Sequence, residues 1–433
     1  MKKILGLFIV TTFIGLSMLA FTPTPSYALP NFAKKHEASC TLCHTVWPAL
    51  NRFGEQYLMN GFQMPDTEDG GDVGKIKPDE HVALDSGGAN PPLAVRLNIE
   101  AYLTRDTKTE GASDDSQSAL IEPKTASPVI FAGGTIGKNF SYFIDDIAAG
   151  GGAEQMWVGL HNIGGPGVVN VRYGVINNAD FDAYSNHRHD LGGFLTSSIT
   201  SGTTTYTLNP AADTNIDPVG LQFYGRPGGG PLTYQVNADI HGRSMTNSLN
   251  YGLMLRGDFE PVAVSYHYGA NNAAKSAWDS TGKDMTSTSQ VLAVRAILPG
   301  IEVSAAYALN SQKDNANNDA QVDTNGMILE GIYFTELFDV QLRYSSMSLS
   351  EAKSSLGSAS NKSDYDRSQI SLKADYHATT NSKIYFKYMT DSYKGDSLKA
   401  TGVYADTTST GCTAAPCANY NDGYSAIGVD LAF

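Results

Sequence analysis

Apolar and polar residues alternate strictly in many short segments that follow an unpatterned N-terminal region. In the first segment, Val95, Leu97 and Ile99 share one face of an extended chain, and Arg96 and Glu100 share the other. Because successive side chains of a β-strand point to opposite faces, each segment predicts a strand with one apolar and one polar face. Sixteen such segments can be assigned, at residues 94–104, 127–137, 139–149, 154–161, 167–177, 217–226, 231–241, 247–257, 261–269, 287–298, 300–311, 325–335, 337–348, 363–377, 382–391 and 423–433.

The connections between these segments also follow a pattern. Even–odd pairs join through short turns, as at Pro299, whereas odd–even pairs join mostly through longer polar segments, the longest at 178–216 and 392–422. Outer-membrane barrels have short periplasmic turns and long external loops, a sorting that a soluble β-sandwich would not require. The last segment ends on Phe433, which resembles the C-terminal recognition signal of such barrels. We therefore expect residues 94–433 to form a porin-like outer-membrane β-barrel, mainly β, of about sixteen antiparallel strands.

The region before the barrel divides into three parts. Residues 1–28 have a basic start, an apolar stretch and the small residues of Ser26-Tyr27-Ala28, which together predict a secretory signal peptide. Residues 29–64 are expected to form a small α-helical segment, and residues 65–93 form an acidic, Gly-rich linker. After the signal peptide, no apolar run is long enough to predict a transmembrane helix.

One helix is predicted in this N-terminal segment. It begins at Pro48 and carries Leu50, Phe53 and Tyr57 on one face. Asn60-Gly61 provides a favourable C-terminal stop.

Composition and charge narrow the class of partner. Gly (43 residues) and Tyr (23 residues) are abundant, as expected for many strands with polar loops. The formal net charge of −14 makes nucleic acid a poor candidate and would attract cations. External loops offer carboxylates that could attract hard cations, although ordinary solvated charge is the more common role of such residues: Asp106, Glu110, Asp114, Asp115, Asp314, Asp319 and Asp323.

The segment Cys40-Thr41-Leu42-Cys43-His44 has the C-x-x-C-H pattern of covalent haem attachment. Two thiols at this spacing can add to the two haem vinyl groups, and the adjacent imidazole can then bind the iron from the proximal side. A thioredoxin-like redox pair would need a βαβ context, and a zinc site would need a second Cys/His pair nearby. The sequence therefore predicts one haem c, bound through Cys40 and Cys43 with His44 as axial ligand.

The distal axial ligand has several candidates. Met64 follows the predicted helix stop, on a turn that could fold back over a haem, and is our preferred choice. Met59, His36 and His81 also lie within reach in the sequence, and an open site is a further alternative. Met59 could instead be a core residue of the helix.

A second pair of cysteines lies near the C-terminus. Cys412 and Cys417 flank Thr-Ala-Ala-Pro in a segment that we place outside the cell. Because an exported protein meets an oxidising compartment, we expect these two cysteines to form a local disulfide.

The residues around the C-x-x-C-H motif form a longer pattern. They comprise Ala28-Leu29-Pro30-Asn31-Phe32-Ala33, then Lys34-Lys35, and, after the motif, Pro48-Ala49-Leu50-Asn51-Arg52-Phe53-Gly54 and Gly61-Phe62-Gln63-Met64. Within the first barrel strands, Gly133-Gly134-Thr135-Ile136-Gly137 leads to Phe140-Ser141-Tyr142-Phe143. This pattern resembles the fused monohaem cytochrome–porins of iron-oxidising bacteria. Lys34-Lys35-His36-Glu37 departs from the Arg-Gln-Thr-Gly that this family commonly has, so the resemblance supports electron transfer across the outer membrane more firmly than Fe(II) as the donor.

The resemblance implies an electron-transfer protein of the outer membrane. Electrons from an extracellular donor, Fe(II) in the family, would pass through one haem to a periplasmic c-type cytochrome or other carrier. The barrel would lie in lipid, with the haem segment at its periplasmic mouth or inside it. Two alternatives remain open: a diffusion porin with a haem-bearing plug or sensor, and electron export to an extracellular acceptor. His187-Arg188-His189, in the longest predicted external loop, could bind metal or simply be an exposed polar loop.

Overall fold

A computed structural model describes most of the predicted barrel and part of the segment before it. It covers residues 32, 40–63, 93–109, 116–118, 122–123, 127–136, 139–145, 155–177, 179–184, 191, 197–201, 204–208, 216–239, 251–275, 284–314, 321–351, 364–379, 382–395 and 419–432. The predicted signal peptide and nearly all of the predicted linker lie outside these residues.

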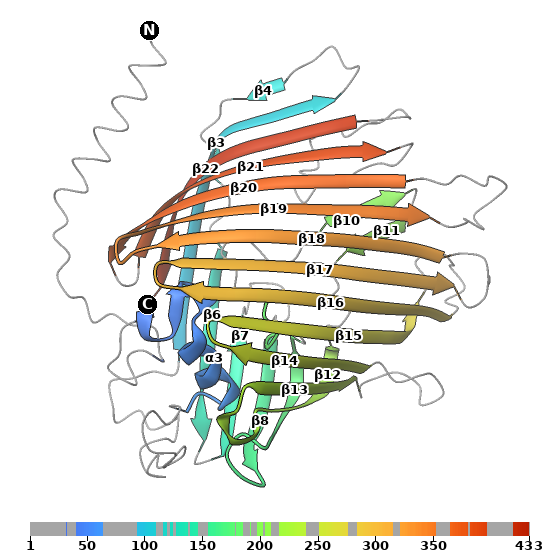
Figure 1. The fold of residues 1–433 in the computed structure, drawn as a ribbon. Coiled ribbons are helices and arrows are strands. Elements are labelled where there is room, and N and C mark those ends of the chain that lie inside the picture. The colour runs from blue at the N-terminus through green and yellow to red at the C-terminus, as the bar shows by residue number, and fades with distance from the viewer. Residues whose placement is uncertain are drawn as a thin grey trace.

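Sixteen long strands form one closed barrel (Figure 1). They are β3 (Leu93–Thr109), β6 (Ser127–Ile136), β7 (Phe140–Asp145), β8 (Gln155–Ile163), β9 (Val169–Ile176), β12 (Ile216–Gly225), β13 (Leu232–Asp239), β14 (Tyr251–Phe259), β15 (Val262–Lys275), β16 (Asp284–Leu298), β17 (Ile301–Asp314), β18 (Gln321–Phe334), β19 (Phe338–Glu351), β20 (Asp364–Thr379), β21 (Ser382–Gly395) and β22 (Asn419–Ala432). Each predicted segment overlaps one of them, so the expected antiparallel barrel is confirmed.

The barrel closes between its first and last strands. β22 pairs antiparallel with β3, so that Leu431 lies opposite Leu97. Two short strands, β4 (Ser116–Ser118) and β5 (Glu122–Pro123), pair with the second half of β3, and β6 pairs with its first half. The three strands therefore lie one after another along the same side of β3. Closure removes the open edge that lipid would otherwise leave unpaired.

The two faces of the barrel differ in polarity as the alternation predicts. In β14, Leu253 and Leu255 are exposed on the outside, and Met254 and Arg256 are buried inside. Across the described strands the exposed large side chains are mostly Leu, Ile, Val, Phe and Tyr, whereas many buried ones are polar or charged. An apolar exterior around a polar interior is the arrangement of a barrel that spans a lipid bilayer.

Short turns and long connections lie at opposite ends of the barrel. β14 and β15, β16 and β17, and β20 and β21 are each joined by two residues at one end, whereas β21 and β22 are joined through residues 396–418 at the other. In Figure 1 the short turns between β15 and β20 gather at the left. The predicted sorting of turns is confirmed.

The connection between β9 and β12 was predicted to be a wholly external loop, and the structure shows that part of it lies inside the barrel. It contains the hairpin β10 (Ser197–Ser201) and β11 (Thr204–Leu208). Its first part, residues 179–184, which we call the luminal segment, is buried inside the barrel, as is Leu191. Polar composition predicted exposure, but contacts with distant strands keep this part inside.

The N-terminal segment lies at the short-turn end of the barrel (Figure 1). Residues 40–63, which we call the plug, comprise the 3-10 turn η1 (Cys40–Leu42), the strands β1 (His44–Val46) and β2 (Ala49–Leu50), and the helix α3 (Arg52–Met59). The helix begins four residues after Pro48, where it had been predicted to start, because β2 occupies Ala49–Leu50. Among the described residues, no helix is long and apolar enough to cross a membrane.

Candidate functional site: a plug that carries the C-x-x-C-H motif

The helix of the plug has defined ends. Asn51 is its N-cap, and the Asn51 Oδ1 accepts a hydrogen bond of 2.9 Å from the backbone N–H of Gly54. Asn60 and Gly61 end the helix as predicted, with Gly61 at a φ of 67°. A β-carbon at residue 61 would lie only 2.3 Å from the His161 ring, so glycine permits both the turn and the close contact with β8.

The C-x-x-C-H segment is fixed on the N-terminus of this helix. The Asn51 Nδ2 donates hydrogen bonds to the carbonyl oxygens of Thr41 and Leu42 at 3.1 and 2.9 Å. The Asn51 backbone N–H donates to the Cys43 carbonyl at 2.9 Å. A β-carbon at residue 54 would lie 2.0 Å from that same carbonyl oxygen, so only glycine allows this packing distance.

The imidazole of His44 is oriented by the plug itself. Its Nδ1 lies 3.2 Å from the Pro48 carbonyl oxygen, which can only accept a hydrogen bond. Nδ1 therefore carries the proton in the neutral ring, and Nε2 has the lone pair that a metal ion binds. Metal-ligating histidines commonly have such a second hydrogen bond. The donor set of Cys43 and His44 thus fits a covalently attached haem with His44 as axial ligand.

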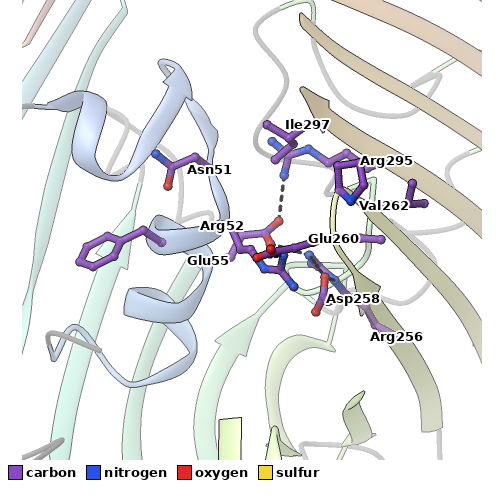
Figure 2. A pocket seen from close by; sticks show the side chains of 12 residues that line it. Asn51, Arg52, Glu55, Arg256, Asp258, Glu260, Val262, Arg295 and Ile297 are labelled. Carbon is purple, nitrogen blue, oxygen red and sulfur yellow. Dashed lines mark hydrogen bonds and ion pairs between the residues drawn. The ribbon is translucent and has the colours of Figure 1, made fainter. Parts of the chain in front are cut away.

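Two arginines of the barrel hold the plug through one buried carboxylate. Glu55 on α3 accepts a hydrogen bond from the Arg256 Nη2 at 2.5 Å and another from the Arg295 Nη1 at 2.8 Å. The Arg295 Nη2 also donates to the Leu50 carbonyl at 2.6 Å. Figure 2 shows Glu55 reaching from the helix toward these arginines of β14 and β16. They lie beside a cavity of about 340 Å³ at the short-turn end.

Further barrel side chains hold both ends of the plug. On β9, the Arg172 Nη2 donates to the Leu58 carbonyl at 3.3 Å. On β21, the Lys383 Nζ donates to the Trp47 carbonyl at 3.0 Å. On β3, the guanidinium of Arg96 lies 4.2 Å from the centroid of the Trp47 ring. The plug is therefore held from strands on several sides of the barrel mouth.

The apolar face of the helix packs against barrel side chains. Leu50, Tyr57, Leu58, Met59 and Phe62 of the plug form one buried cluster, which we call the plug cluster, with residues of the barrel and the luminal segment: Trp157, Ile176, Phe181, Tyr224 and Met254. These barrel side chains cover Leu50 and Tyr57, two residues of the apolar helix face predicted from the sequence. The other possibility for Met59, a core residue, is confirmed.

Tyr57 lies next to the C-x-x-C-H segment as well as in this cluster. Burial raises the pKa of the Tyr57 phenol well above 10.0, and the nearby Cys43 raises it further. The phenol therefore remains protonated at neutral pH.

The luminal segment meets the plug and crosses to the opposite wall. Phe181 belongs to the plug cluster, and its carbonyl accepts a hydrogen bond of 3.2 Å from the Arg256 Nη1. The Ala183 backbone N–H donates to the Ser265 Oγ at 2.8 Å, and the Tyr184 hydroxyl lies 3.4 Å from the Glu330 Oε2. These contacts reach β15 and β18, strands that no plug contact described above involves.

Several predicted site residues lie outside what the structure describes. These are the side chain of Cys40, Met64, His36, His81, His187-Arg188-His189, Cys412 and Cys417. The haem, its distal ligand and the disulfide therefore stay predictions. On the polar, inner face of β3, Arg96 contacts the plug, and Glu100 is buried and accepts a hydrogen bond of 3.0 Å from the Tyr385 hydroxyl.

Sequence reasoning missed the residues that hold the plug. No sequence motif marks these charged residues, which are Glu55, Arg172, Arg256, Arg295 and Lys383. The only available signal was their position on the polar, inward face of predicted strands or, for Glu55, on a helix expected to dock at the mouth.

Comparisons with known proteins support the fold. No family model matches the chain, and no curated protein sequence matches it. Among solved structures, an anion-selective porin from Comamonas acidovorans is similar with a TM-score of 0.50 and 14% identity, over 79% of this chain and 100% of that chain. In-vitro folded OmpT, an outer membrane protein of Vibrio cholerae, has a TM-score of 0.48 and 13% identity, over 79% and 98%. The chain therefore has a porin-like fold.

Proposed function

We propose that this chain is an outer-membrane cytochrome–porin that transfers electrons from an extracellular donor, Fe(II), to periplasmic c-type cytochromes or other carriers. The observation that carries this proposal is the docking of the plug, which carries the C-x-x-C-H motif: side chains of several strands hold its residues Glu55, Leu58 and Trp47 at the short-turn mouth of a closed barrel. A haem attached to this motif would lie at the mouth of a barrel that crosses the lipid between two aqueous compartments.

The chain's own residues supply attachment, orientation and shielding. Cys40 and Cys43 would form the thioether bonds, and His44, oriented through Pro48, would be the proximal ligand. A bound haem supplies a one-electron couple, whose potential the axial ligands set. The plug cluster restricts water on the barrel side of this segment.

Met64 is proposed as the distal ligand, because it directly follows Gln63, which is completely buried at the docked end of the plug. Replacing Met64 by Ala would remove a thioether ligand and lower the haem potential. An unchanged visible spectrum and an unchanged potential in this variant would rule out the assignment.

A diffusion porin is the second candidate, and the fold likeness favours it. The similar structure from Comamonas acidovorans is described as an anion-selective porin, and nothing in that comparison points to electron transfer. In this alternative the haem segment would be a plug or sensor in a channel for solutes.

Oriented proteoliposomes separate the two functions. With the oxidised holoprotein inserted in one known direction, Fe(II) added on the long-loop side should reduce the haem, as followed by its visible bands. The His44→Ala variant, which cannot keep the proximal ligand, should lose this response. Reduction of the wild-type haem only from the short-turn side would contradict the electron conduit and leave the porin function.

A further inference from the structure

Four buried polar side chains gather on the inner wall beyond the plug. They are Gln222 on β12, Asn237 on β13, His267 on β15 and Asp182 in the luminal segment, with exposed fractions of 0, 1, 4 and 2%. Strand register places Gln222 opposite Asn237, and Asn237 opposite Gly252. The group thus spans four neighbouring strands and one segment that enters the lumen.

Within the described part of the chain, this group has an excess of polar atoms without hydrogen-bond partners. Both amide atoms of Gln222, both of Asn237 and the Nε2 of His267 have none. The Nδ1 of His267 lies 3.1 Å from the Asp182 Oδ2, so only its other nitrogen is left without a partner. Buried polar atoms in folded proteins are normally paired, so a gathering of unpaired ones points to a ligand.

Two of these side chains converge on the same small volume. A β-carbon at Gly252 would lie 3.1 Å from the Asn237 Nδ2 and 3.3 Å from the His267 Nε2. No side chain occupies this volume, because residue 252 is glycine. Since the oxygen and nitrogen of an amide exchange places by a flip, the Asn237 oxygen can face the imidazole.

We propose that His267, Asn237 and Gln222 bind a divalent first-row transition-metal ion. Imidazole nitrogen and amide oxygen are ordinary ligands for such ions, and a carboxylate on the other ring nitrogen is the partner that metal-binding histidines commonly have. Asp182 is thus a positioning residue. Among the described residues, no three His, Cys, Asp or Glu side chains form a metal-binding group, so this site relies on one imidazole and two amides.

The location connects the site with the proposed function. His267 lies opposite Met254, which is part of the plug cluster. Gly252 lies two residues farther than Met254 from the β14–β15 turn, so the site is on the long-loop side of the plug. An ion that enters from that side meets the site before the plug. The identification of the ion as the substrate Fe(II) rests on the proposed function, whereas metal binding itself does not.

Metal binding can be measured without any electron transfer. Full-length holoprotein, kept oxidised, would be titrated with Mn(II), and the electron paramagnetic resonance signal of the free ion would report binding. We expect an ion bound by the wild type to be held at least tenfold more weakly by His267→Ala. The matched control is His377→Ala, which removes another histidine paired with a carboxylate, the Nε2 of His377 lying 2.9 Å from the Asp339 Oδ2.

A second variant covers the case in which His267→Ala fails to fold. Gly252→Ala keeps every ligand and fills the volume between them, so it should also weaken Mn(II) binding. Equal affinity in the wild type and in the folded variants would overturn the site.

Stopped-flow mixing with Fe(II) separates this inference from the proposed function. If His267→Ala slows haem reduction by Fe(II) but not by dithionite, the site is where the substrate binds. If Mn(II) binds as expected but Fe(II) never reduces the haem, the proposed function fails and the metal site stands. If Fe(II) reduces the haem equally fast in both proteins and Mn(II) binding is also equal, the site fails and the proposed function stands.

Discussion

At the scale of single residues, Glu55 determines where the plug sits. Its carboxylate is the only group on α3 that contacts two barrel arginines in the described structure, and all three side chains are buried. Removing one partner of a buried ion pair leaves an uncompensated charge in a medium that solvates it poorly.

We therefore predict that Glu55→Gln weakens plug docking by about 3–5 kcal/mol. Limited proteolysis of the folded barrel would measure this as faster cleavage within residues 40–63. Arg52→Gln is the control, because Arg52 pairs with Glu260, whose side chain is 77% exposed, and such pairs contribute about 0–1 kcal/mol. Equal cleavage rates in the two variants would contradict the assigned role of Glu55.

Gly54→Ala should separate the helix from the C-x-x-C-H segment. The new β-carbon would meet the Cys43 carbonyl, which is backbone and cannot move aside without moving Cys43 and His44, the proposed haem-binding residues. We expect less covalently attached haem per chain, measured by haem-stained gels. Gly331→Ala is the control, since a β-carbon there has no neighbour within 4 Å, and it should leave haem content unchanged.

At the scale of elements, Asn51 joins the helix to the motif by two means. Asn51→Ala would lose the N-cap, at a cost of about 1 kcal/mol, together with the hydrogen bonds to Thr41 and Leu42. Asn51→Ser would restore only the cap. The measurement is the midpoint temperature at which the visible haem bands are lost on heating. We predict that the midpoint of Asn51→Ser lies between those of the wild type and Asn51→Ala. Equal midpoints for the two variants would show that the cap contributes nothing.

The strands were predictable because their pattern is local. A period of two over about ten residues fixes both the strand and its inward face. One example is the inward Met254, which lies between the outward Leu253 and Leu255. The luminal segment was not predictable in this way. Asp182 and Ala183 are buried by His267 and Ser265, partners more than eighty residues away that no local pattern reveals.

The same distinction applies to the candidate site. Cys43 and His44 could be proposed as haem-binding residues from a spacing that covalent attachment requires, together with the resemblance to cytochrome–porins. Arg172 and Lys383 are recognisable only once the plug is seen between the strands that carry them. Their role depends on the closed barrel and not on their neighbours in the sequence.

At the scale of the whole molecule, the plug and the luminal segment together obstruct the barrel. Plug contacts reach β3, β9, β14, β16 and β21, and the luminal segment reaches β15 and β18. We predict little ion conductance for the intact protein in planar bilayers. Deletion of residues 40–63 should raise the conductance severalfold, while deletion of the β10–β11 hairpin should not. High conductance of the intact protein would favour the diffusion porin.

The contacts of the plug also fix the order in which the protein can be completed. Its partners lie as far as 336 residues away in the chain, so docking has to wait until strands as late as β21 have joined the sheet. Contacts of such long sequence separation form late in folding. During this interval the cysteines and histidine of the plug remain open to the periplasmic enzymes that would attach a haem. On the proposed function, this interval is when a haem would be attached, before the plug docks in the barrel.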